Sequence, residues 1–419
     1  MQLLVIADDF TGALDTGIQF ARHGIATTLF LSDALTAGLL ADCQADVVVA
    51  DTESRHLPPE DAAARVRAVT RLAKAAGCPV FYKKTDSTLR GNLGAELAAM
   101  QDVCGAKRLW FAPAYPALGR TTRNGTQLVN GVPLARTDFA ADPFNPVRTD
   151  FVPALLAEQT DRPVRIAASA ALPPEADRPE LVVFDAETDA ELLQTAQALW
   201  AHGEAVCLAG CAGFAAALEA VLDLPRTAQV PELPNGSLLL VCGSVHPRAV
   251  AQCRYAAAHC GYPELPLTAA QMLSDTGDDA KTLDTLCAAL ERSGRALLRV
   301  SGGRECLAET AALAARLSID PQTVPARIAT RLGALTAQVL ARKKPAALIV
   351  FGGDTLLGIA RSLGCTSVTP LAELLPGIVL SQMQTDTGAL FVVTKAGGFG
   401  DEALMRLIEE RLHTISTGG

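Results

Sequence analysis

Apolar runs alternate with stretches of helical periodicity through the first part of the chain. The runs are short and rich in Val, Ile and Leu, which predicts buried strands, and the stretches between them repeat apolar residues every three or four positions, which predicts helices. This alternation is typical of a parallel sheet covered by its connecting helices. Strands are predicted at 3–7, 27–31, 47–50, 80–83 and 109–112, and helices at 12–23, 59–76 and 93–103.

The same alternation restarts in the second half, with strands predicted at 237–241, 296–300, 347–351 and 390–394. Residues 226–236 are rich in proline and show no periodicity, which is typical of a linker between domains. We therefore expect an α/β protein with two domains, 1–225 and 237–419, joined by a linker at 226–236. Each domain should hold a mostly parallel sheet flanked by helices, with the active site in the cleft between the domains.

Residues 112–153 interrupt the alternation. They contain several prolines and little regular pattern. A loop of this length in a compact domain is usually either functional or disordered, and its content of arginine, threonine and glycine favours function.

Length and composition narrow the function classes. The 419 residues exceed one ordinary core, and 49% hydrophobic with 19% charged residues indicates a packed globular enzyme. The chain has no apolar run of about 18 residues and no basic leader, so we expect a cytoplasmic protein without a membrane partner. A net charge of −9 argues against nucleic acid as a partner. A small molecule remains as the expected partner, and the sequence leaves a homodimer open.

Cysteine and histidine spacing argues against a metal site. The 11 cysteines include no CxxC pair, and the 6 histidines include no HxxxH pair. We therefore expect neither a disulfide framework, nor structural zinc, nor a catalytic metal held by the protein.

Charged and hydroxylated side chains follow several predicted strands of the first half, where the carboxyl ends of parallel strands share one edge of the sheet. A single such residue usually caps the next helix. Two lysines, two arginines and several carboxylates are more than caps require, so we predict a ligand site built from Asp8, Asp9, Arg55, Lys83, Lys84, Thr85, Asp86 and Arg90.

Strand geometry makes two further predictions about neighbours in this set. Side chains alternate along a strand, so only one of Lys83 and Lys84 should face the site. Asp8 and Asp9 should likewise point in opposite directions, with Asp8 toward the ligand and Asp9 capping the helix that follows.

The strand ends of the second half are rich in glycine instead. Glycine permits a close backbone approach, so that amide N–H groups can bind phosphate oxygens at a helix N-terminus. One Gly-Gly pair is weak support, but several in one domain predict a nucleotide site. The sequence has no GxxxxGK[ST] motif and no GxGxxG after its first strand, which disfavours P-loop kinases and dinucleotide dehydrogenases. The loops are Gly243-Ser244, Ser301-Gly302-Gly303, Gly352-Gly353-Asp354-Thr355 and Lys395-Ala396-Gly397-Gly398.

With these residues in view, the chain resembles the four-carbon acid sugar kinase family, formerly a domain of unknown function, and most closely its D-threonate kinase branch. The likeness runs nearly end to end. It is carried by the motifs IADDFTGALDTG at 6–17, DTESR at 51–55, YKKTDSTLRGNLGAE at 82–96, GRTTRNGTQLVNGVPL at 119–134, GGDT at 352–355 and TKAGGFG at 394–400.

The resemblance implies an N-terminal acid-sugar domain, a C-terminal ATP domain, and transfer of the γ-phosphoryl group from the Mg²⁺ complex of ATP to the C4 hydroxyl. Asp8, Arg55 and Lys83 to Asp86 match substrate-binding positions of the family. Ser244, Gly352 to Thr355 and Gly398 match its nucleotide-binding positions, and we expect Gly397 beside the phosphates as well.

We predict a role for each group from phosphoryl-transfer chemistry. Arg55 and one of the two lysines should hold the sugar carboxylate, and Asp86 should complete the hydroxyl contacts. Asp8 or Asp9 should orient or deprotonate the attacking hydroxyl, and Arg90 or Lys395 should offset charge on the γ-phosphate.

Several alternatives stay open at this point. Erythronate, L-threonate or a 3-oxo-tetronate could replace D-threonate, because the sequence departs from the threonate branch at 243–248 and over much of 135–230. From other classes, the chain could be a non-catalytic acid-sugar sensor or a dehydrogenase. A sensor would not need the glycine-rich loops of a second site.

Overall fold

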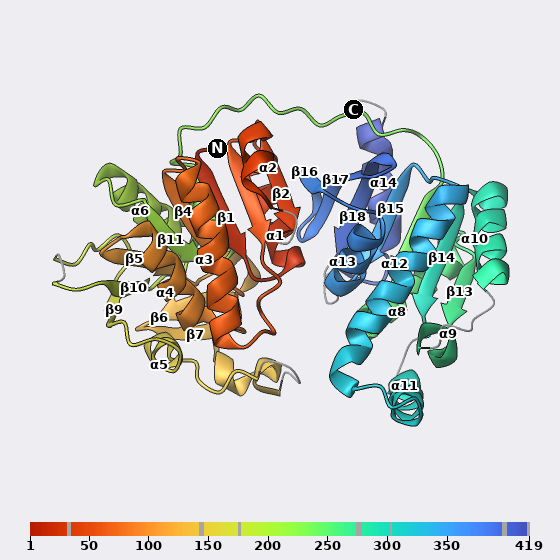
Figure 1. Cartoon of the computed structure of the whole chain (residues 1–419), viewed down its shortest axis with the longest axis horizontal. Coiled ribbons are helices and arrows are strands. Elements are labelled where there is room, and N and C mark those ends of the chain that lie inside the picture. Colours follow the sequence, from red (N-terminus) through yellow and green to blue (C-terminus); the bar gives the residue numbers. More distant parts are fainter. Residues whose placement is uncertain are drawn as a thin grey trace. The chain divides into compact units, whose positions relative to one another are not determined.

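The computed structural model describes residues 1–31, 35–141, 146–174, 177–273, 279–301, 304–395 and 400–416. The chain forms two compact units, Met1–Ala228 and Gln229–Gly419 (Figure 1). Each unit is an α/β structure with a mostly parallel sheet, which confirms the predicted fold class.

The sheet of the first unit has the strand order β2-β3-β1-β4-β11-β5-β10-β9, and the pairings described within it are parallel. Its central strands are buried on both faces, which explains why they are uninterrupted apolar runs. The strands are β1 (Leu3–Ala7), β2 (Thr27–Leu31), β3 (Val47–Asp51), β4 (Val80–Lys84), β5 (Arg108–Ala112), β9 (Val164–Ala167), β10 (Glu180–Phe184) and β11 (Cys207–Gly210).

Helices pack on this sheet, and two of them begin close to the ends of the strands that precede them. Apolar side chains of α3 and α4 join those of β1, β3 and β4 in one continuous core. Helix α1 follows β1 directly, and α4 begins shortly after β4. The helices are α1 (Phe10–Ala21), α2 (Ala37–Asp42), α3 (Pro59–Ala75), α4 (Leu93–Cys104), α5 (Val152–Ala157), α6 (Asp189–Ala201) and α7 (Ala212–Glu219).

The segment after β5 contains a small antiparallel sheet that the sequence analysis did not predict. It comprises β6 (Arg120–Arg123), β7 (Thr126–Val129) and β8 (Val132–Pro133), flanked by the short 3₁₀ turns η1 (Pro116–Leu118), η2 (Leu134–Arg136) and η3 (Asp138–Ala141). Its two turns are Asn-Gly pairs with positive φ at both residues. Asn-Gly between short strands is a strong hairpin signal, so the hairpins could have been predicted from it.

The sheet of the second unit has the order β13-β14-β12-β15-β18-β17-β16. The pairings from β13 to β18 are parallel, whereas β18-β17-β16 is an antiparallel extension. The strands are β12 (Leu238–Cys242), β13 (Glu264–Leu267), β14 (Arg295–Val300), β15 (Ala347–Phe351), β16 (Ser367–Leu375), β17 (Ile378–Thr385) and β18 (Gly388–Lys395).

The helices of this unit follow the same pattern as in the first, since α8 and α13 begin just after β12 and β15. None of the helices in the described ranges is both long and apolar enough to cross a membrane. They are α8 (Pro247–His259), α9 (Ala269–Leu273), α10 (Asp279–Ser293), α11 (Arg304–Arg316), α12 (Val324–Arg342), α13 (Gly353–Ser362) and α14 (Leu404–Ser416), with a 3₁₀ turn η4 at Pro321–Thr323.

Candidate active site

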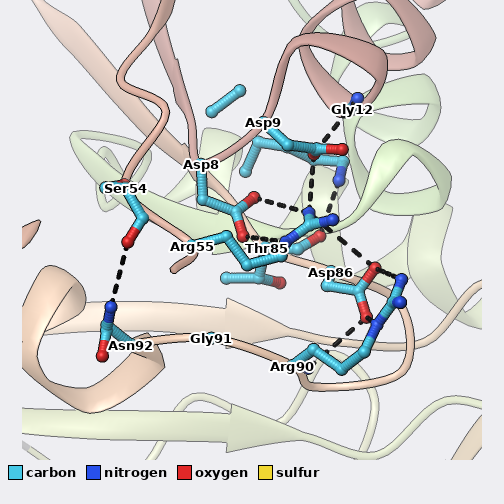
Figure 2. A network of polar contacts seen from close by, with 12 residues as sticks. Asp8, Asp9, Gly12, Ser54, Arg55, Thr85, Asp86, Arg90, Gly91 and Asn92 are labelled. Carbon is cyan, nitrogen blue, oxygen red and sulfur yellow. Dashed lines mark hydrogen bonds and ion pairs between the residues drawn. The ribbon is translucent and has the colours of Figure 1, made fainter. Parts of the chain in front are cut away.

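Three neighbouring strands of the first unit end side by side. In the parallel register, Ala7 at the end of β1 pairs with Asp51 of β3 on one side and with Lys84 of β4 on the other. The residues that leave these strands therefore share one edge of the sheet, as the sequence predicts. Figure 2 shows the resulting group of polar side chains.

Arg55 lies at the centre of this group and contacts three carboxylates (Figure 2). Its Nε and Nη2 donate to Asp8 Oδ2 and Oδ1 at 2.7 and 3.0 Å, and Nη2 also donates to Asp9 Oδ1 at 2.6 Å. Asp86 Oδ1 lies 3.9 Å from Nη2. Such a two-bonded arginine–carboxylate pair fixes both side chains in orientation as well as position.

Charge and burial act in opposite directions on Asp8, which is only 3% exposed. Burial alone would raise the pKa of this carboxyl, but Arg55, Lys83 and Lys84 outweigh it and hold the pKa below its ordinary value. Asp8 is therefore ionised at neutral pH.

Asp9 caps helix α1, because its Oδ1 accepts a hydrogen bond from the backbone N–H of Gly12 at 3.2 Å. This confirms the predicted cap. The prediction that Asp8 and Asp9 point in opposite directions is wrong, since both contact Arg55. A carboxylate has acceptor capacity for several donors, so Asp9 can serve the helix and the guanidinium together.

The two lysines at the end of β4 point to different surroundings, as strand alternation predicts. Lys83 is fully buried, and its Nζ lies 3.0 Å from Glu96 Oε2. Lys84 Nζ donates to the carbonyl of Thr85 at 2.8 Å. It also lies beside the first turn of α1, because a Cβ atom added to Gly12 would be 2.9 Å from Nζ. Among the described residues, no carboxylate forms an ion pair with Lys84.

Asp86 organises the loop that follows β4. It accepts hydrogen bonds from Nε and Nη2 of Arg90 at 2.8 and 2.9 Å, and from the backbone N–H and hydroxyl of Thr88. Burial opposes ionisation, but Arg55 and Arg90 hold the pKa of Asp86 well below its ordinary value. The loop turns at Gly91, with φ of +96°, where a Cβ would lie 3.3 Å from Arg55 Cγ.

Two groups close to this site were not predicted. Glu96 on α4 binds both Lys83 and the hydroxyl of Ser54. Gln127 on β7 donates from Nε2 to the carbonyl of Ser87 at 3.1 Å, which ties the new hairpin sheet to the loop after β4. Both are buried polar side chains in helix or strand positions, so only the tertiary packing reveals their contacts.

The glycine-rich strand ends of the second unit also meet at one edge. Cys242, Phe351 and Lys395 are register partners at the ends of β12, β15 and β18. Beyond them, a Cβ on Gly243 would lie 2.1 Å from Thr355 Oγ1, so the Gly243-Ser244 loop adjoins the start of α13. Gly352 adopts φ of +114° and donates its N–H to the carbonyl of Lys395 at 3.1 Å.

This edge leaves the first amides of α13 beside a tight glycine turn, an arrangement suited to phosphate oxygens. Gly353 opens the helix, Asp354 lies in its first turn and Thr355 is buried. The predicted residues Gly302, Gly303, Gly397 and Gly398 lie outside the described residues.

A buried cation lies at the same edge. Lys395 is 2% exposed, and its Nζ sits 4.6 Å from the centre of the Phe351 ring. Burial lowers the pKa of this lysine to about 8. His246, which caps α8, has its pKa lowered by burial and by the charges of Lys395 and Arg248. Lys395 and Arg248 therefore supply the positive charge at this edge, whereas His246 is neutral at pH 7. Among the described residues there is no cluster of histidine, cysteine and carboxylate groups that could hold a metal ion.

Each of the two units matches a known protein family. Residues 3–218 match the family described as "Sugar-binding N-terminal domain", and residues 239–405 match "Nucleotide-binding C-terminal domain". A solved structure from Salmonella typhimurium shares the fold, with a TM-score of 0.76 at 22% identity over 97% of this chain and 98% of that one.

Curated relatives match over almost the whole length. A D-threonate kinase of Salmonella typhimurium is 34% identical over 97% of both chains, and one of Bordetella bronchiseptica is 33% identical over 98% of both. A D-erythronate kinase of Heliobacterium modesticaldum is 30% identical over 99% of this chain and 98% of its own. With its sugar-binding and nucleotide-binding domains in this order, the chain belongs to the four-carbon acid sugar kinase family.

Proposed function

We propose that this protein transfers the γ-phosphoryl group of ATP, supplied as its Mg²⁺ complex, to the C4 hydroxyl of a four-carbon acid sugar, with D-threonate as the preferred acceptor. The observation that carries the proposal is the pair of unlike sites. A cluster of fixed charges ends the sheet of the sugar-binding domain, and glycine turns with a buried lysine end the sheet of the nucleotide-binding domain. The D-threonate kinases among the relatives support the choice of acceptor.

The sugar acid would bind the first site through groups whose bonding capacity is not already used. Arg55 uses Nε and Nη2 for its hydrogen bonds to Asp8 and Asp9, so Nη1 would be the nitrogen that donates to the sugar. Lys84 has no carboxylate partner among the described residues, so it is the better placed of the two lysines to meet the substrate carboxylate. Thr85 Oγ1 is buried without a hydrogen bond to a described residue and would contact a sugar hydroxyl.

Asp8 would orient the C4 hydroxyl and accept its proton. Phosphoryl transfer proceeds through a loose transition state in most analyses, so the protein mainly positions the nucleophile and offsets charge. An ionised carboxylate held rigidly by Arg55 fits that task, even though its lowered pKa makes it a weak base. Asp86 and Arg90 would fix the other face of the sugar, with the Arg90 charge near the incoming phosphoryl group.

The nucleotide would lay its phosphates along Ser244, Gly352, Gly353, Asp354 and Thr355. The first amides of α13 would donate to phosphate oxygens, and Lys395 would offset their charge. The Mg²⁺ that accompanies ATP would neutralise part of the remaining phosphate charge. Gly397 and Gly398 stay in the proposal on the strength of the motif alone.

A coupled ADP-release assay with Mg-ATP tests the function. D-threonate, L-threonate, D-erythronate and a 3-oxo-tetronate are compared at equal concentrations, and kcat/KM for D-threonate should be the highest. A higher kcat/KM for another of these acids would overturn the acceptor assignment but not the kinase activity. ADP release that no acid stimulates would overturn the kinase activity itself.

A further inference from the structure

A buried polar network lies directly beneath the charged site of the first unit. Its centre is Glu96, which is 2% exposed and lies in the first turn of α4. One carboxylate oxygen of Glu96 accepts from the hydroxyl of Ser54, and the other lies 3.0 Å from the fully buried ammonium of Lys83. Glu96 therefore contacts residues that belong to two different strand ends.

The network reaches all three strands that carry the charged groups. Lys83 Nζ also donates to the carbonyl of Lys84 at 2.7 Å, immediately before Thr85 and Asp86. On the other side, the Ser54 hydroxyl lies 2.7 Å from that of Thr52, which donates to the carbonyl of Ala7 at 2.7 Å. Ala7 precedes Asp8, and Ser54 precedes Arg55, so short polar contacts that begin at the Glu96 carboxylate reach the backbone beside each charged group. The Thr52 and Ser54 hydroxyls donate to Ala7 and Glu96, so the two oxygens touch without a hydrogen bond of their own.

A second contact fixes the helix that carries Glu96 to the same loop. Asn92, at the start of α4, donates from Nδ2 to the carbonyl of Ser54 at 3.0 Å (Figure 2). The same Nδ2 donates to the carbonyl of Leu57 at 2.8 Å. The position of the Glu96 carboxylate relative to the loop after β3 is thereby set from two directions.

We propose that Glu96 is a positioning residue of this site, whose buried carboxylate holds the ends of β1, β3 and β4 at the spacing that the sugar acid requires. Lys83 then acts through Glu96 and the Lys84 carbonyl and does not touch the substrate. The inference rests on the proposed function, because it names the scaffold of that same site.

Charge makes the role of this network measurable. Asp8 is faced by Arg55 from the loop after β3, by Lys83 and Lys84 from β4, and by Glu96 from α4. Lys83 helps to hold the pKa of Asp8 down. Burial and the charge of Asp8 raise the pKa of Glu96, and because like charges repel each other mutually, an ionised Glu96 disfavours a charged Asp8. Removing Lys83 and removing Glu96 should therefore affect Asp8 in opposite directions.

The test uses Glu96→Gln, Lys83→Met and the double variant, with Glu180→Gln as a matched control. Glu180 is also 2% exposed and forms an ion pair with Arg165 at 3.0 Å. It is the first residue of β10, so it lies at the amino ends of the strands, whereas the site lies at their carboxyl ends. All four proteins are assayed well below their unfolding midpoints, for kcat, for the KM of ATP and for D-threonate binding by calorimetry.

We expect Glu96→Gln to lower kcat and D-threonate affinity by about tenfold or more, with the KM of ATP changed by less than about twofold. The double variant should lose no more than the worse single variant, because a lone buried charge is costlier than a neutral pair. Lys83→Met should lose activity on acidification at a higher pH than the wild type, and Glu96→Gln should not. Glu180→Gln should lower the unfolding midpoint only.

Wild-type kcat and D-threonate affinity in Glu96→Gln would overturn the inference while leaving the kinase function intact. Losses in the double variant that equal the sum of the single losses would also overturn it, since they would show that the two side chains act independently. A wild type that binds D-threonate without phosphorylating any acid would overturn the proposed function alone, and the binding measurements would still decide the role of Glu96. A wild type that neither binds nor phosphorylates any of the acids would overturn both.

Discussion

Arg55→Ala should destabilise the first unit and do so in a pH-dependent way. The substitution leaves Asp8, Asp9 and Asp86 close together without the guanidinium that separates them. Removing one partner of a buried ion pair costs about 3–5 kcal/mol. We expect the low end, about 3 kcal/mol, because Lys83 and Lys84 remain near Asp8 and the side chain of Asp9 is 27% exposed.

That loss corresponds to a fall of roughly 6–12 °C in the unfolding midpoint, at about 2–4 °C per kcal/mol for a unit of this size. The sign of the pH effect follows from Asp8. In the wild type its pKa is lowered, so its pairing stabilises the fold above the ordinary carboxyl pKa, and this stability is lost as pH falls through the lowered value. In Arg55→Ala, burial prevails and raises the pKa, so protonation relieves the buried charge.

Urea unfolding followed by circular dichroism at about pH 7.5 and about pH 5.5 measures both effects. The difference in the free energy of unfolding between the wild type and Arg55→Ala should be smaller at the lower pH. Arg123→Ala, which removes a solvent-exposed arginine paired with Glu187, serves as the control and should change little at either pH. A difference that stays constant or grows on acidification would refute the view that Arg55 neutralises buried Asp8. The same variant should raise the KM of the sugar acid by about tenfold, because it also removes the Nη1 donor.

Three further predictions concern single side chains. Asp8→Asn should lower kcat by about 10²-fold, which steady-state kinetics would measure, and a fully active Asp8→Asn enzyme would show that Asp8 has no catalytic role. Asp9→Ala should instead lower the free energy of unfolding by about 1 kcal/mol, because it removes a helix cap, and unfolding curves would measure this loss. Because the pKa of Lys395 is lowered to about 8, its positive charge is lost as pH rises through that value, so the KM of ATP should increase several-fold between about pH 7 and about pH 9. Lys395→Met should abolish this pH dependence. Gly352→Ala places a side chain at φ of +114° and should weaken ATP binding by about tenfold in calorimetry, while Gly388→Ala, at φ of +96° in open space, carries similar strain and should bind ATP normally.

The sequence predicted the first five parallel strands of the first sheet and four of the second because buried parallel strands are continuous apolar runs, as in β1, β3 and β15. It did not predict the parallel strands β9, β10, β11 and β13. It also missed β16 and β17, which extend the second sheet in antiparallel fashion. Pro370 lies inside β16, and proline within an apolar run argues against a strand. The structure accommodates it beside a register shift between Pro370 and Ala372, a feature that depends on the partner strand.

For the site, the sequence predicted which residues share an edge, because the end of a parallel strand fixes the place of the residues that follow it. It did not predict the partners within that edge. Arg55 contacts Asp8 and Asp9 only because the turn into α1 brings both carboxylates to one guanidinium. The burial of Lys83 depends on α4 packing Glu96 beneath the sheet edge, a contact between elements that no local pattern encodes.

The central claim is that this chain phosphorylates the terminal hydroxyl of a four-carbon acid sugar. The most direct measurement incubates the purified protein with Mg-ATP and D-threonate and analyses the product by mass spectrometry and by phosphorus and carbon NMR. We expect one phosphate monoester per sugar, formed in step with ADP, with phosphorus coupling to C4 and to its protons. A phosphorus that couples to the proton on C2 or on C3 instead of the C4 protons, a phosphate on the carboxyl group, or ADP formed without any phosphorylated acid would contradict this claim.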